Sequence, residues 1–150
     1  MIKKAKNEII YLTVEDFEII VSSLISTNDE FSEDIPPFNT RYEGRLEGIL
    51  GQIEANYFGK ELYSGLINKA VWLFYCLIKG HPFFNGNKRI AVVALFVFLK
   101  RNTSELYINE AALLNGLFQM AIRTAESKPE ELEYIKAYLK RKIRAFILQY

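Results

Sequence analysis

The stretch GHPFFNGNKRIAVVALFVFL, residues 80–99, contains two contrasting halves. Its first half carries glycines, a proline and two cations, a composition that interrupts a helix and favours a loop. Its second half, Ile90 to Leu99, is an uninterrupted apolar run about half as long as a membrane-spanning helix. We therefore expect a polar loop that leads, near Asn87, into a helix buried in a protein core.

Apolar residues recur at helical spacing on both sides of this stretch. The other predicted helices are Val14 to Ser26, Leu46 to Ile53, Leu62 to Leu77, Asn109 to Thr124, and a last one over about residues 128–148. We expect an all-α fold, a single helical bundle of about six helices in one domain that spans residues 1–150.

Local signals mark the ends of these predicted helices. Thr13 is expected to cap the first helix, Gly80 to end the third, and Asn109 to cap the fifth. Ser127 and Glu130 have the spacing of a capping box for the last helix.

Residues 27–42 lack helical periodicity and include the pair Pro36-Pro37. The prolines favour extended backbone, and so long a loop is usually functional or mobile. We expect a short β-hairpin near residues 35–42.

The composition argues against several classes of function. Nineteen basic and eighteen acidic residues give a formal charge of +1, which argues against a nucleic-acid partner recognised through its phosphates. Cys76, the only cysteine, can form no internal disulfide and is expected to be a buried structural thiol. The first residues do not resemble a signal peptide. We expect a cytoplasmic protein that binds neither membrane nor nucleic acid directly.

The loop before the buried helix has the composition of a phosphate site. Gly86 leaves room for a ligand, the first helical amides can donate to an anion, and Lys88 and Arg89 supply positive charge. His81 is the only histidine and precedes a proline that restricts the loop, and histidine is the side chain most often used as a general base near neutral pH. Two plainer interpretations remain open: a histidine in an ordinary loop, and a basic turn without a ligand.

Residues 81–89, His81-Pro82-Phe83-Phe84-Asn85-Gly86-Asn87-Lys88-Arg89, resemble the Fic/Doc family signature, H-P-F-x-[DE]-G-N-[GK]-R. Asn85 is the one departure at a specified position. The segment from Arg41 to Leu50 is also similar to the Doc branch of the family, and the resemblance covers about residues 9–125.

This resemblance implies a helical domain that transfers part of ATP to a Ser, Thr or Tyr hydroxyl of a target protein. By position, His81 would be the base on that hydroxyl, while Gly86, Asn87, Lys88 and Arg89 would hold phosphates. Phe83 would be a buried anchor. An antitoxin could act as a partner in trans.

Three functions stay open under this resemblance. Lys88 stands where AMP-transferring members usually carry glycine, and the lysine form is associated with Doc, a phosphate-transferring toxin, so we rank kinase chemistry ahead of AMP transfer. Asn85 replaces the acid that holds Mg²⁺ in the family; we expect it to be a poor metal ligand, and Mg²⁺ to arrive with ATP. The third possibility is a catalytically silent domain that senses nucleotide or binds protein.

Residues 35–42 occupy the position of the family's flap, which holds a target segment by strand addition. Phe38, Asn39 and Thr40 would dock the target. The alternative is an ordinary surface loop.

Overall fold

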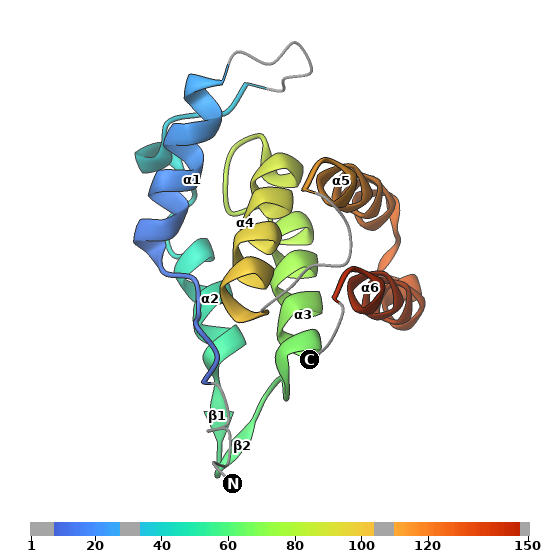
Figure 1. The fold of residues 1–150 in the computed structure, drawn as a ribbon. Coiled ribbons are helices and arrows are strands. Elements are labelled where there is room, and N and C mark those ends of the chain that lie inside the picture. Colours follow the sequence, from blue (N-terminus) through green and yellow to red (C-terminus); the bar gives the residue numbers. More distant parts are fainter. Residues whose placement is uncertain (1–7, 28–33, 104–109, 148–150) are drawn as a thin grey trace, which may run out of the picture.

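The computed structural model describes residues 8–27, 34–103 and 110–147. In these ranges the chain forms six α-helices and a two-stranded antiparallel hairpin (Figure 1). The helices are α1 (Val14–Ser26), α2 (Arg45–Glu54), α3 (Leu66–Lys79), α4 (Asn87–Asn102), α5 (Glu110–Glu126) and α6 (Leu132–Phe146). The predicted all-α fold of about six helices is confirmed.

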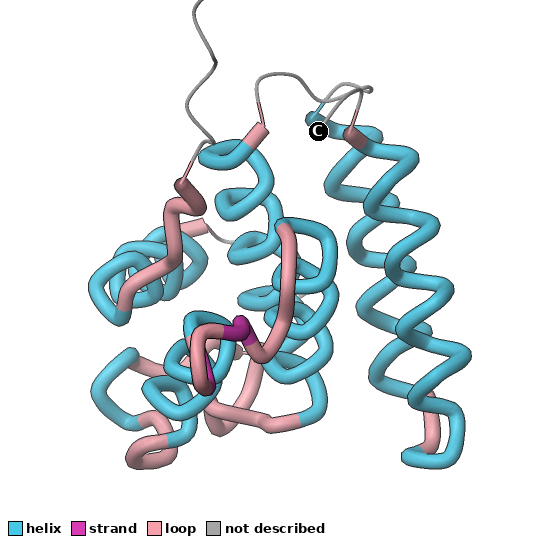
Figure 2. The backbone as a smooth tube through the Cα atoms, turned by 90° about the horizontal axis from the view of Figure 1, so that it is seen from below, coloured by secondary structure: helices cyan, strands magenta, loops and turns pink. Residues whose placement is uncertain are grey.

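The central pair of the bundle is α3 and α4, which pack against each other and against most other helices. α1 and α2 lie on one side of this pair and α5 and α6 on the other (Figure 1). Figure 2 shows α5 and α6 running side by side along one edge of the molecule. α4 is buried on most of its surface, as its apolar sequence predicts for a central helix. None of the described helices is both long and apolar enough to cross a membrane.

α1 has the predicted limits and the predicted cap. The Thr13 hydroxyl accepts a hydrogen bond from the Asp16 N–H at 3.3 Å, and the Asp16 carboxylate accepts one from the Thr13 N–H at 2.8 Å. α3 begins at Leu66, later than predicted, because residues 62–65 still belong to the connection from the hairpin. There the Leu62 N–H donates to the carbonyl of Ala55 at 2.8 Å.

The hairpin is not where the sequence predicted it. Its strands are β1 (Asn56–Tyr57) and β2 (Lys60–Glu61), between α2 and α3. Residues 38–40 instead form a 3₁₀ turn, preceded by prolines that have no N–H for a strand ladder. The hairpin turn places Phe58 and Gly59 at φ 54° and 80°, the backbone of a two-residue hairpin loop. In Figure 1 the hairpin lies at the lower end of α3, and the α3–α4 loop lies at the upper end.

The last helix begins differently from the prediction. The Ser127 hydroxyl donates to the carbonyl of Thr124 at 2.6 Å instead of capping the next helix. Glu131 takes the capping role, because its carboxylate accepts from the Lys128 N–H at 3.0 Å, and a 3₁₀ turn over Pro129–Glu131 leads into α6. The predicted cap at Asn109 lies outside the described residues.

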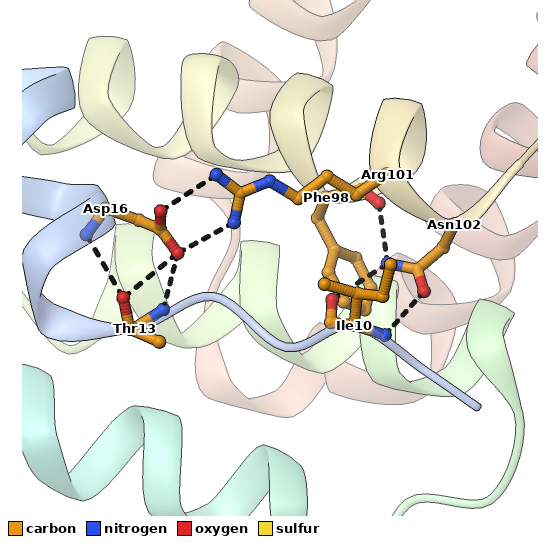
Figure 3. Close-up of polar contacts among 6 residues, drawn as sticks. All are labelled: Ile10, Thr13, Asp16, Phe98, Arg101 and Asn102. Carbon is orange, nitrogen blue, oxygen red and sulfur yellow. Dashed lines mark hydrogen bonds and ion pairs between the residues drawn. The ribbon is translucent and has the colours of Figure 1, made fainter.

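The segment before α1 is fastened to the end of α4 (Figure 3). The Asn102 side chain accepts from the Ile10 N–H at 2.8 Å and donates to the Ile10 carbonyl at 3.0 Å. Arg101 donates to both carboxylate oxygens of Asp16, each at 2.8 Å. This guanidinium lowers the pKa of Asp16 to about 2. The contacts join the first helix to the central one.

α3 carries a buried cation. The Lys69 side chain is fully buried; its Nζ donates to the carbonyl of Ile53 at 2.9 Å and lies 3.8 Å from the Glu61 carboxylate. It therefore satisfies a carbonyl at the C-terminus of α2. Cys76, predicted to be buried, is only partly so, and burial raises its pKa to about 11.

Candidate functional site

The α3–α4 loop surrounds a small cavity of about 130 Å³. Five of the predicted site residues line it, namely His81, Asn85, Gly86, Asn87 and Lys88, together with Ile78, Phe84 and Ala125. Ligand pockets usually measure about 300–1,000 Å³, so this cavity has the scale of a phosphate group and not of a whole nucleotide. Arg89 lies on the first turn of α4 but does not line the cavity.

His81 is exposed and has an unusual backbone conformation for a residue other than glycine. Its φ is 45°, in the left-handed region, where strain is often stored at functional sites. Its Nδ1 lies 3.1 Å from the backbone carbonyl of Lys79. Because a carbonyl only accepts, we assign the proton to Nδ1, which leaves the lone pair of the neutral ring on Nε2. The ring thus has a free basic atom.

Asn87 fixes the shape of the loop through its side chain. Its amide oxygen accepts from the Phe83 N–H at 3.0 Å, and its amide nitrogen donates to the Phe83 carbonyl at 2.9 Å. Since both polar atoms of this buried side chain are engaged, the group that Asn87 can offer a ligand is its backbone N–H at the start of α4.

Phe83 is buried, with only 1% of its surface exposed, which confirms its predicted structural role. Its ring lies between Phe17 of α1 and Phe38 of the 3₁₀ turn, with centroid distances of 6.5 and 6.4 Å. The loop is therefore anchored in the core through Phe83.

Gly86 has a structural requirement in addition to the predicted room for a ligand. Its φ of 75° is left-handed, and a Cβ built on it would lie 2.3 Å from Cδ1 of Ile35. A side chain at this position would thus collide with an apolar side chain of the 35–42 segment. The proximity of Ile35 to Gly86 brings that segment against the loop.

The predicted docking residues Phe38, Asn39 and Thr40 lie close to the loop but do not line the cavity. Phe38 packs on Phe83, and the Thr40 hydroxyl donates to the Pro37 carbonyl at 2.6 Å. Asn39 is exposed and borders a separate surface depression next to Glu47, whose pKa is lowered by a hydrogen bond from Arg41.

Two cations at the site were missed in the sequence. Arg45, the first residue of α2, donates to the His81 carbonyl at 3.1 Å. The Lys79 Nζ donates to the carbonyls of Ala125 and Ser127 at the end of α5. A cation in the last turn of a helix is common, but nothing in the sequence indicates contacts between residues so far apart.

The cavity does not fit a protein-held magnesium ion. None of the described residues that line it is acidic, and the described part of the chain contains no group of three or more His, Cys, Asp or Glu side chains able to hold a metal. Mg²⁺ prefers carboxylate oxygens together with retained waters. The lining instead includes Asn87 and Lys88, the first residues of α4, and a helix start with a lysine suits an anion.

Residues 11–99, more than half of the chain, match the model of the Fic/DOC family. This match includes the whole α3–α4 loop and ends within α4, so α5, which contributes Ala125 to the cavity, lies beyond it. Searches among curated proteins and among solved structures gave no match.

Proposed function

The chain belongs to the Fic/DOC family, whose domains are known for transferase activity, and we propose that it moves a phosphate or AMP group from ATP to a hydroxyl of a target protein. The observation that carries this proposal is the hydrogen bond between His81 Nδ1 and the Lys79 carbonyl, because it leaves Nε2 unprotonated on a residue that lines an anion-sized cavity. We further propose a Doc-like toxin that is held inactive by an antitoxin in trans.

In this reaction His81 Nε2 takes the proton of a Ser, Thr or Tyr hydroxyl while the hydroxyl oxygen attacks phosphorus. Attack on the γ-phosphate breaks its bond to the β-phosphate oxygen and releases ADP; attack on the α-phosphate releases pyrophosphate. The protonated imidazole then returns its proton to solvent. Backbone amides at the start of α4, with Lys88 and Arg89, would bind the phosphates. ATP is expected to bring its own Mg²⁺.

Lys88 supports phosphate transfer ahead of AMP transfer, through the resemblance to Doc. A second candidate function is a silent domain that binds nucleotide or protein. It is favoured because none of the described residues that line the cavity is acidic. Asn85, which stands where the family signature has an acid, is one of them.

The deciding experiment uses ATP labelled separately at the α and γ phosphates, incubated with the protein and a cell lysate. Label transferred only from the γ position identifies a kinase, and label from the α position identifies an AMP transferase. His81→Ala should abolish either transfer, whereas Lys60→Ala, on the distant hairpin, should not. Bound nucleotide without transfer would support the silent domain.

The toxin proposal has its own test, because transfer alone does not make a toxin. Expression of the wild-type chain should arrest growth, and His81→Ala should relieve the arrest while Lys60→Ala does not. Normal growth despite abundant folded protein would contradict a toxin.

The docking role of residues 38–40 can be tested on Asn39. Its side chain is exposed, so Asn39→Ala leaves the packing of Phe38 on Phe83 intact. We expect less target modification with unchanged ATP affinity. Equal modification of the target by the variant and the wild type would refute this role.

A further inference from the structure

Arg45 holds the backbone of His81 from outside the loop. Its Nη1 donates to the His81 carbonyl at 3.1 Å, and its guanidinium lies 4.0 Å from the centre of the Tyr42 ring. Stacking on an aromatic face restricts a long side chain that is otherwise exposed, so the donor is kept in place.

Tyr42 connects the same segment to the loop at two further points. Its N–H donates to the Pro82 carbonyl at 3.1 Å, and its ring meets Phe84 edge-on at 4.6 Å. Tyr42 and Arg45 therefore contact three loop residues, His81, Pro82 and Phe84. Of these contacts, the one from Arg45 is made to His81 itself.

The backbone conformation of His81 that these contacts maintain is unfavourable by itself. His81 has a φ of 45°, and residues other than glycine keep such a backbone only where their surroundings enforce it. The same conformation sets the imidazole within 3.1 Å of the Lys79 carbonyl. Release of the His81 carbonyl would let the backbone relax and would carry the ring away from that carbonyl.

We propose that Arg45 is a positioning residue for His81. By holding the His81 carbonyl it maintains the left-handed backbone, which keeps the proton on Nδ1 and leaves Nε2 available as the base. The catalytic part of this inference rests on the proposed function; the structural part, the control of the ring by Arg45, does not.

Arg41 provides a matched control. Its guanidinium also stacks on an aromatic ring, that of Phe38 at 4.1 Å, but its hydrogen bonds go to the Phe38 carbonyl and to Glu47. Arg41→Ala thus removes a stacked arginine from the same segment without removing a donor to His81. Because Arg45 is exposed, Arg45→Ala should fold.

The test is ¹⁵N NMR of the imidazole, which His81 alone contributes because the chain has one histidine. In the neutral wild-type ring we expect a protonated Nδ1 and a bare Nε2. Arg45→Ala should move the ring toward the Nε2–H tautomer that free imidazole side chains prefer in water. Arg41→Ala should match the wild type, and Arg45→Lys, which keeps a donor, should stay closer to the wild type than Arg45→Ala.

An unchanged tautomer in Arg45→Ala, or an equal change in Arg41→Ala, would overturn the proposal. The NMR measurements on Arg45→Ala and Arg41→Ala require neither nucleotide nor target. Their outcome is therefore independent of whether the proposed transferase function is correct. Where transfer is measured, Arg45→Ala should lower kcat about tenfold to a hundredfold with the KM for ATP unchanged. Loss confined to KM would also count against a positioning role.

Discussion

At the scale of single residues, the left-handed backbone of His81 should lower the stability of the folded chain. A left-handed conformation costs a residue with a Cβ about 1–2 kcal/mol, and glycine avoids this cost. Glycine also gives the unfolded chain more freedom, which costs about 0.4–1 kcal/mol, so the strain term is the larger. We expect His81→Gly to be about 0.5–1 kcal/mol more stable than His81→Ala in urea unfolding. If His81→Ala were the more stable variant, the backbone at His81 would not be strained.

Asn87 and Asn85 make a second comparison within the same loop. Asn87→Ala removes two hydrogen bonds to the Phe83 backbone inside a buried site and should lower the free energy of unfolding by about 2 kcal/mol. Asn85 is exposed, so Asn85→Ala should stay within about 0.5 kcal/mol of the wild type. Thermal and urea unfolding of both variants would check this. Similar losses of stability in the two variants would contradict the role of the Asn87 hydrogen bonds in holding the loop.

The sequence predicted the site residues that are local and missed those that are not. His81, Asn85, Gly86 and Lys88 are close in the chain, so a loop at a helix start was enough to bring them to one cavity. Arg45 reaches the loop from α2, and Lys79, although only two residues before His81, contacts the end of α5; these partners follow only from how α2 and α5 pack. The role of Gly86 was also hidden, because nothing local shows that Ile35 packs against it.

At the scale of elements, two glycines within helices predict different effects of alanine on stability. Gly48, on the exposed face of α2, has nothing within 4 Å of a Cβ, whereas a Cβ on Gly116 of α5 would lie 2.8 Å from Phe146 of α6. Gly48→Ala should therefore raise the free energy of unfolding by about 0.5–1 kcal/mol through helix propensity. Gly116→Ala should gain less or lose stability, because Phe146 must move. Equal gains would show that α5 and α6 are less closely packed than the structure indicates.

Element boundaries were predictable where a local signal was strong. The capping box at Thr13 and the apolar spacing after it predicted both ends of α1. The hairpin was misplaced because two-residue strands carry almost no periodicity, and because the turn uses Phe58-Gly59, where Asn-Gly or Asp-Gly is the usual signal. Ser127 was misassigned because its hydroxyl can bond backward as well as forward.

At the scale of the whole molecule, the Asp16–Arg101 pair joins α1 to the end of α4 and makes stability depend on pH. The pKa of Asp16 in the folded protein, about 2, is below the ordinary value of 3.8, so the unfolded chain binds more protons between these pH values. The contribution is therefore complete above about pH 4 and is lost as pH falls through 2. Since Arg101 is partly exposed, we expect about 1–2 kcal/mol.

Asp16→Asn should accordingly be less stable than the wild type at pH 7, and the difference should shrink as the pH approaches 2. Urea unfolding at a series of pH values measures it. Glu110→Gln, which breaks the exposed ion pair with Lys100, is the control and should show little effect at either pH. A difference that stayed constant with pH would argue against the ion pair as its source.

The hairpin turn at Phe58 and Gly59 offers a point of attachment on this molecule. Phe58 is fully exposed, and nothing approaches a Cβ at Gly59. The 14 residues of α3 separate this turn from the His81 loop by roughly 20 Å. Exposed turn tips tolerate insertions, so a fluorescent domain or affinity tag inserted between these two residues should leave the cavity undisturbed and accessible.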